Sequence, residues 1–306
     1  MTRRRPATPT LGRRIQFAVA ALLAPVAVGA CQGGLTDSPT PSTTTTTPEV
    51  VVIEGRPLRR RNGRIHRARS RRGHSHITDR HALWLSPTVR DALAEAWREQ
   101  AELEHASIVA FHDLAARLTR VGAPAELVAG ANRAAEQEAD HAGRCFDLAA
   151  RYLGESLRPG RLRPLHRRHR SREQELAALA VEALRDGVVN EGYAAWLAGE
   201  RRARATDQLV RAALDVITLD EADHARLSAD VLQWCIAEGG ATTRAAVDEA
   251  AATLPERMVA CVIPHGVERT ALAAHGVSDP DLDGHGYRAV RDAALEMVGA
   301  LASAPG

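Results

Sequence analysis

The five letters EADHA occur at residues 138–142 and again at residues 221–225 of this 306-residue chain. A Glu and a His three residues apart lie on one face of a helix, so both side chains can reach a single metal ion. In the two copies these pairs are Glu138 with His141 and Glu221 with His224. The repeat therefore predicts two helices that each present a carboxylate and an imidazole.

Each copy has a further glutamate upstream at a similar interval, Glu104 before the first and Glu191 before the second. The order Glu…Glu-x-x-His…Glu…Glu-x-x-His is the ligand pattern of carboxylate-bridged two-metal sites in helical bundles. One Glu-x-x-His arises by chance on charged helices, whereas two copies with matching upstream glutamates are far more specific. The alternative interpretation is that these residues are paired charges on the surface.

Apolar residues at steps of three and four predict four amphipathic helices around these motifs. They run from about 87 to 120, from about 124 to 152, from about 171 to 204, and from the turn at 205–207 to about 238. Glu104 is the only charge in the apolar stripe of the first helix. Aromatic residues make up only 3% of the chain, and this favours slender, closely packed helices over a β-sandwich or barrel.

The short turns allow the heights of the ligands to be compared. Glu104 lies 18 residues before Gly122, while Glu138 and His141 lie 16 and 19 residues after it. At ~1.5 Å of rise per residue, all three are about 24 to 29 Å from the turn and therefore level with one another. The second hairpin gives a similar result when distances are counted from Ala205.

Residues 154–171 contain two prolines and many arginines, so we expect no helix there. Extended, these residues reach about 60 Å, at ~3.3 to 3.6 Å each, which is longer than the second helix, at about 43 Å. They can therefore cross the whole bundle and make the third helix parallel to the second. Further helices, expected at about 242–262 with a break at Pro255 and at about 287–303, would cover the flank. The predicted class is all-α, a four-helix bundle over 86–238 with one long crossover and a helical extension over 239–306.

Residues 1–31 have the features of an export signal. Arginines precede an apolar run at 17–30, which is too short to span a bilayer comfortably. The run ends in Val-Gly-Ala-Cys31, which resembles the bacterial lipoprotein box, where the cysteine is lipidated and becomes the new N-terminus. The alternative is an ordinary cleavage site beside an incidental cysteine. Gln32 after the cysteine resembles outer-membrane sorting, so we expect an exported cell-envelope protein that is anchored through Cys31 and faces the periplasm.

Residues 32–85 are expected to form a disordered linker, rich first in threonine and proline and then in arginine. Residues 56–72 hold nine arginines and no acidic residue. Three interpretations are open: binding of nucleic acid, attraction to anionic lipid headgroups, or a solvated spacer. Export argues against nucleic acid as a partner.

Residues from about 90 to 238 resemble the ferritin-like superfamily of di-iron carboxylate proteins, and more narrowly the ferritin-like domains found on bacterial lipoproteins. The resemblance rests on EHASIVAF at 104–111, EQEADHA at 136–142, Glu191, and DEADHA at 220–225. It implies that Glu104 and Glu191 each bind one metal ion as terminal ligands and that Glu138 and Glu221 bridge the two ions. It also implies that His141 and His224 complete the two ligand sets.

Physical chemistry also favours metal in this position. Four carboxylates in an apolar stripe would repel one another and lose hydration, and two divalent ions would cancel their charge. Mixed oxygen and imidazole ligands suit two Fe(II) ions, with Mn(II) as the alternative, and zinc also accepts such ligands. Gln137 and Asp220 lie four residues before the two histidines, where they either accept a hydrogen bond from an imidazole or lie on the surface.

Three functions are consistent with such a site. The first is a redox enzyme that uses O2 or peroxide to oxidise Fe(II) or another substrate. The second is a module that binds or sequesters metal without turnover, and the third is a structural bundle stabilised by its metal. Members of the superfamily include ferroxidases, peroxide reductases, catalases and hydroxylases, and a shared fold does not decide among such activities.

Overall fold

The structure, a computed structural model, describes residues 55–59, 65–76, 79, 82–162, 165, 170–256, 267–277 and 280–302. The predictions made for the export signal, Cys31 and the threonine-rich tract fall outside these residues. Most of the described chain is helical, which confirms the all-α class. In chain order the elements are β1 Arg71–His76, the short 3-10 helix η1 Ala82–Trp84, α2 Pro87–Val121, α3 Ala125–Leu153, β2 Glu155–Arg158, α4 Arg172–Glu182, the π-helical η2 Ala183–Val189, α5 Asn190–Arg204, α6 Gln208–Ala252, α7 Arg269–Ala274 and α8 Pro280–Ala302.

Helices α2 and α3 form the first hairpin, and local sequence sets its ends. The Ser86 hydroxyl accepts a hydrogen bond from the backbone N–H of Val89 at 3.3 Å, which caps the start of α2. Gly122 ends α2 in the left-handed conformation, with φ of 80°, where glycine has no steric penalty. Pro124 then precedes α3. The turn is as short as the sequence predicts, and the two helices pack along their length.

The second hairpin joins α4, η2 and α5 to α6. A capping box between Ser171 and Gln174 starts α4. Helix α6 continues past Gly240, where φ of 55° marks a kink, and ends at Ala252. The additional helix expected over 242–262 is therefore the last part of α6, and it stops early because Pro255 and the residue before it cannot continue a helix.

The connection between the two hairpins runs the length of α3. Arg172, at the start of α4, donates to the carbonyl of Val121 at 3.0 Å, so α4 begins beside the end of α2. At the opposite end, Arg151 of α3 donates to Asp207, which precedes α6, at 2.8 Å. These two contacts make α3 parallel to the segment formed by α4, η2 and α5.

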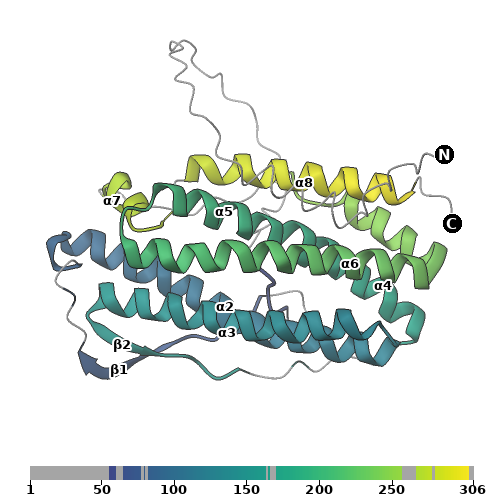
Figure 1. Ribbon diagram of the computed structural model, residues 1–306, viewed down its shortest axis with the longest axis horizontal. Coiled ribbons are helices and arrows are strands. Elements are labelled where there is room, and N and C mark those ends of the chain that lie inside the picture. The colour runs from purple at the N-terminus through teal and green to yellow at the C-terminus, as the bar shows by residue number, and fades with distance from the viewer. Residues whose placement is uncertain are drawn as a thin grey trace, which may run out of the picture.

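Figure 1 shows α2 and α3 on one side, α5 and α6 next to them, and α8 running along the opposite side. Helix α8 contacts α5, η2 and α6. The buried apolar residues form two clusters, one around Phe111 and Leu184 and one around Trp97 and Cys145. The buried glutamates of the predicted site lie between these clusters, so a charged layer divides the apolar core. Among the described residues, no helix is long and apolar enough to cross a membrane.

The arginine-rich segment differs from the expected disordered linker. Strand β1 pairs antiparallel with β2, which lies in the crossover. Leu58 and Ala68 are buried against the helices, and Glu102 of α2 accepts hydrogen bonds from the backbone N–H and the hydroxyl of Ser70, both at 2.7 Å. Arginines in this segment meet carboxylates on the helices, and these long-range pairs stabilise a stretch that its own composition would leave solvated.

The π-helical segment η2 brings its backbone close to α6. A Cβ atom at Gly187 would overlap the Cβ and Oγ atoms of Ser228, so only glycine allows this approach. Such π segments occur frequently at functional sites. Here it directly precedes Glu191, the glutamate that α5 contributes to the predicted site.

Replacing Gly187 with alanine is expected to destabilise the protein by about 1–3 kcal/mol, because a helix must move to admit the methyl group. Gly143 is the matched control: it is an exposed helical glycine in α3, and a Cβ there would meet no atom within 4 Å. Gly143→Ala is expected to stabilise by roughly 0.5–1 kcal/mol. Urea unfolding of both variants measures the difference. Equal effects of the two substitutions would show that η2 and α6 are not in contact at Gly187.

Candidate metal centre

The six predicted ligands converge between the helices. Their side chains are between 0 and 2% exposed. They form two groups, and within each group one nitrogen or oxygen atom from every residue lies within 4.8 Å of the others. The first position consists of Glu104, Glu138, His141 and Glu221, and the second position consists of Glu138, Glu191, Glu221 and His224.

Glu138 and Glu221 belong to both positions. Each comes from an EADHA repeat, one on α3 and one on α6, so the repeat places a shared carboxylate on each of two facing helices. Glu104 from α2 completes only the first position, and Glu191 from α5 completes only the second. Within each hairpin the ligands therefore lie at the same height along the helices, as their distances from the turn predict.

Most of the inward-facing atoms of this cluster lack a hydrogen-bond partner. In the described part of the chain this holds for both carboxylate oxygens of Glu138, Glu191 and Glu221, and for the Nδ1 atoms of both histidines. The Nδ1 atom of His141 is 3.5 Å from Glu221, and that of His224 is 3.4 Å from Glu138. Buried polar atoms are rarely left unpartnered, because each loses its hydration. A divalent cation would satisfy these oxygens and nitrogens together.

The outer nitrogens of the two histidines are held by residues from the opposite helix. His141 Nε2 donates to Asp220 Oδ2 at 3.1 Å, and His224 Nε2 donates to Gln137 Oε1 at 3.1 Å. Gln137 also donates to Asp220 Oδ1 at 2.6 Å. Hydrogen bonds at Nε2 select the tautomer that leaves the Nδ1 lone pair free for a metal. Of the two alternatives left open for Gln137 and Asp220, the structure shows contact with the histidines, and each residue contacts the histidine of the other repeat.

Crowding of the glutamates raises most of their pKa values. Burial raises the pKa of Glu138 well above its usual range, and the charges of Glu104, Glu221 and Glu191 raise it further. Burial and the charge of Glu221 act in the same way on the pKa values of Glu191 and Glu104. Without metal, therefore, these carboxyl groups take up protons at pH values where a solvated glutamate is charged.

Glu221 and His141 behave differently and form the charged pair of the metal-free site. Burial alone would raise the pKa of Glu221, but contacts with His141 and His224 hold it below its usual range. Burial alone would lower the pKa of His141, but its contacts with Asp220 and Glu221 raise that pKa to about 10. The two bridging glutamates are therefore electrostatically unequal, although they occupy equivalent places in the repeat.

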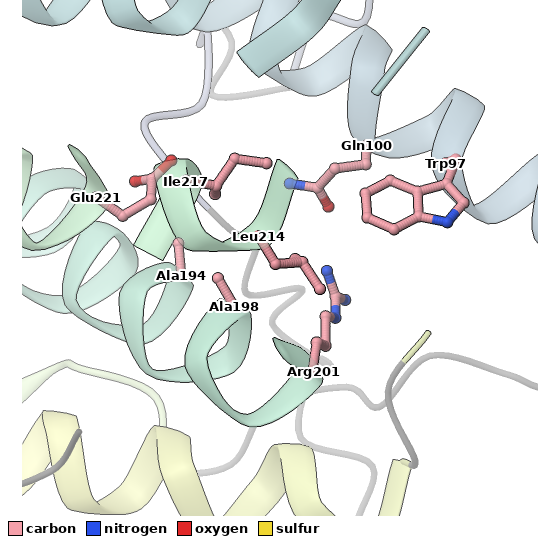
Figure 2. Close-up of a pocket in the computed structure, with 8 residues that line it drawn as sticks. All are labelled: Trp97, Gln100, Ala194, Ala198, Arg201, Leu214, Ile217 and Glu221. Atoms are coloured by element: carbon pink, nitrogen blue, oxygen red, sulfur yellow. The ribbon is translucent and has the colours of Figure 1, made fainter. Parts of the chain in front are cut away.

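A small cavity reaches the site between α2, α5 and α6, as Figure 2 shows. Its volume of about 10 Å³ has room for roughly one water-sized molecule. Glu221 and Gln100 contribute to its wall, and Gln100 also donates a hydrogen bond to Glu104. The other lining residues are Trp97, Ala194, Ala198, Arg201, Leu214 and Ile217. A molecule of this size in the cavity would lie beside one of the shared ligands, Glu221.

Sequence reasoning missed Gly55 and Arg56, which lie against the second position. A Cβ atom at Gly55 would be 3.6 Å from Glu191 Oε2. The Arg56 carbonyl accepts a hydrogen bond from the Ser107 hydroxyl at 2.8 Å, and its guanidinium lies 5.2 Å from the centre of the Phe111 ring. Arg56 is one of nine arginines in its segment, and nothing in the sequence distinguishes it from the others.

The chain matches no known protein family, no curated protein and no solved structure in the comparisons made with each. Its class is therefore defined by the fold and the site alone. It is an all-α protein with a buried glutamate–histidine cluster that could hold a metal ion.

Proposed function

We propose that this is a ferritin-like protein whose buried cluster binds two divalent metal ions, with iron as the expected metal and manganese as the alternative. The observation that carries the proposal is the sharing of Glu138 and Glu221 by two otherwise complete ligand groups. The pairing of α2 with α3 and of α4, η2 and α5 with α6, with a long connection between the hairpins, is the arrangement that ferritin-like bundles use.

We further propose that the site carries out redox chemistry with O2 or peroxide. Bound ferrous iron would supply the electrons for the reduction of either oxidant. The four glutamates would balance the charge of two divalent ions, while Asp220 and Gln137 keep the histidines in the ligating tautomer. The cavity beside Glu221 has room for about one water-sized molecule, so it favours a small reactant such as O2 or peroxide over a large organic substrate.

Metal analysis of the full-length protein, followed by anaerobic addition of Fe(II) and then of O2 or peroxide, tests this function. With Fe(II) supplied in excess as the electron donor, we expect two bound ions per chain and oxidation of many more Fe(II) ions than these two, because the bound pair alone supplies only two electrons. Two ions with a single stoichiometric oxidation would favour a sequestering module. Metal that raises the unfolding temperature without any redox reaction would favour a structural role. Binding of a single ion away from Glu138 and Glu221 would contradict the proposed site.

The location is also a proposal, since it rests on the sequence of residues 1–32. We propose that the protein is exported, lipidated at Cys31 and held at the outer membrane, so that the site works in the cell envelope. Detergent partitioning of the wild-type protein and of Cys31→Ser measures the anchor. A Cys31→Ser protein that is processed normally and still fractionates with membranes would contradict it.

A further inference from the structure

The start of the described chain lies directly over the second metal position. Gly55 approaches the Glu191 carboxylate, and the Ser107 hydroxyl of α2 holds the backbone of Arg56. The Arg56 guanidinium lies over Phe111, and the Phe111 ring in turn lies 4.9 Å from the His224 ring. Arg56 is only 4% exposed, so its charge is buried on the side of Glu191 and His224.

Arg56 is less fully paired than its neighbour Arg59, although its charge, like that of Arg59, lowers the pKa of Asp186, which burial raises. Arg59 donates to Asp186 from Nε at 3.0 Å and from Nη2 at 2.9 Å. By contrast, Arg56 Nη1 has no hydrogen-bond partner among the described residues. Burial and Glu221 raise the pKa of Glu191, and the Arg56 charge opposes that rise, so the guanidinium is close enough to act on this ligand.

The surroundings of the two metal positions therefore differ in charge. At the first position, the residue that contacts the terminal ligand is Gln100, a neutral amide that donates to Glu104. At the second position, the segment that lies against the terminal ligand Glu191 contains the buried cation Arg56. With two divalent ions bound, the four glutamates are neutralised, and the Arg56 charge then faces an ion of the same sign.

We propose that Gly55 and Arg56 belong to the metal centre and that the Arg56 guanidinium makes the second position bind divalent ions more weakly than the first. This inference rests on the two-metal function proposed above. The second position would load last and release its ion first. One arginine of the arginine-rich segment, Arg56, would thereby have a specific function, which is to weaken metal binding at the second position.

Protons compete with metal for Glu191, but this competition does not reverse the expected effect of the Arg56 charge on metal affinity. The guanidinium repels a divalent ion about twice as strongly as a proton at the same place, because Coulomb energy scales with charge. Removing the guanidinium would therefore strengthen metal binding more than it strengthens proton binding at Glu191. The gain should be greatest at high pH, where few protons compete for the ligands.

A calorimetric titration of the full-length protein with Mn(II) at pH 8 tests the proposal. Mn(II) is chosen because it is stable in air. We expect two binding steps, of which Glu191→Gln loses the weaker and Glu104→Gln the tighter. Arg56→Gln should tighten the weaker step about tenfold and leave the tighter step within twofold. Arg56→Lys keeps the charge and is the matched control, so it should keep both steps close to those of the wild-type protein.

Equal effects of Arg56→Gln and Arg56→Lys, or no tightening with Arg56→Gln, would overturn the inference while leaving the two-metal function intact. Fewer than two ions bound by the wild-type protein would instead contradict that function. Should Arg56→Gln fail to fold, Ser107→Ala provides a second test, because it releases the backbone of Arg56 and keeps the side chain. We expect it to tighten the weaker step by a smaller factor, and unchanged affinity would count against the proposal.

Discussion

Replacing Glu138 with glutamine is expected to abolish tight binding of both metal ions and to stabilise the metal-free protein at pH 8 by about 1–4 kcal/mol. Glu138 belongs to both positions, so its loss removes a ligand from each. In the metal-free protein, burial and three neighbouring glutamates raise the pKa of Glu138 well above its usual range. Folding at pH 8 must therefore bind a proton or bury an unpaired charge, and the neutral amide removes that cost.

The equivalent substitution in the other repeat is the matched control, and we expect the opposite effect on stability. Glu221→Gln should also abolish tight metal binding. In the metal-free protein, however, the Glu221 charge offsets that of His141, whose pKa its contacts raise to about 10. Removing the partner of a buried charge costs roughly 3–5 kcal/mol, so this variant should be less stable than the wild-type protein.

Chemical unfolding of the chelator-treated wild-type protein and of both variants at pH 8 measures these effects, and Mn(II) titration measures the affinities. Opposite changes in stability, together with loss of binding in both variants, would support the unequal charge states of the two bridging glutamates. If both substitutions stabilise the metal-free protein, or neither alters its stability, this description of the cluster is wrong.

The second large effect is a fall in the stability of the metal-free protein as the pH rises from about 6.5 to 10. Glu138, Glu191 and His141 all have pKa values raised above those of the unfolded chain, which are about 4.3 for glutamate and 6.5 for histidine. The folded state thus keeps protons that the unfolded state releases. For each such proton, the free energy of unfolding falls by about 1.4 kcal/mol for every unit by which the pH rises. The lowered pKa of Glu221 acts in the opposite sense, but only in acid, outside this range.

Metal should reverse this trend, because the ligands must lose their protons to bind it. Unfolding measured at pH 6, 7, 8 and 9, with Mn(II) and with chelator, gives the two slopes. The double variant Glu138→Gln with Glu191→Gln serves as the control and should have a flatter metal-free slope. A metal-free wild-type protein whose stability does not change over this range would mean that the carboxylates do not share one buried site.

The sequence by itself determines the all-α class and the composition of the candidate site. Helical periodicity is a local property, so Glu138 and His141 share a face wherever their helix is placed. A short turn at Gly122 then fixes the height of Glu104 relative to both. The sequence also places Gln137 and Asp220 one helical turn from a histidine, whereas their contacts with the histidine of the other repeat depend on how the helices pack. These inferences require only distances along the chain and the rise of a helix.

Only the tertiary structure decides the features that depend on residues far apart in sequence. The arginine-rich segment reads as a linker because its partners, such as Glu102 and Asp186, lie on helices more than thirty residues away. The π segment at Gly187 depends on the shape of α6 at Ser228, which local periodicity does not contain. Likewise, the two EADHA repeats are identical in sequence, and their glutamates differ in pKa only because buried charges interact with whatever surrounds them in three dimensions.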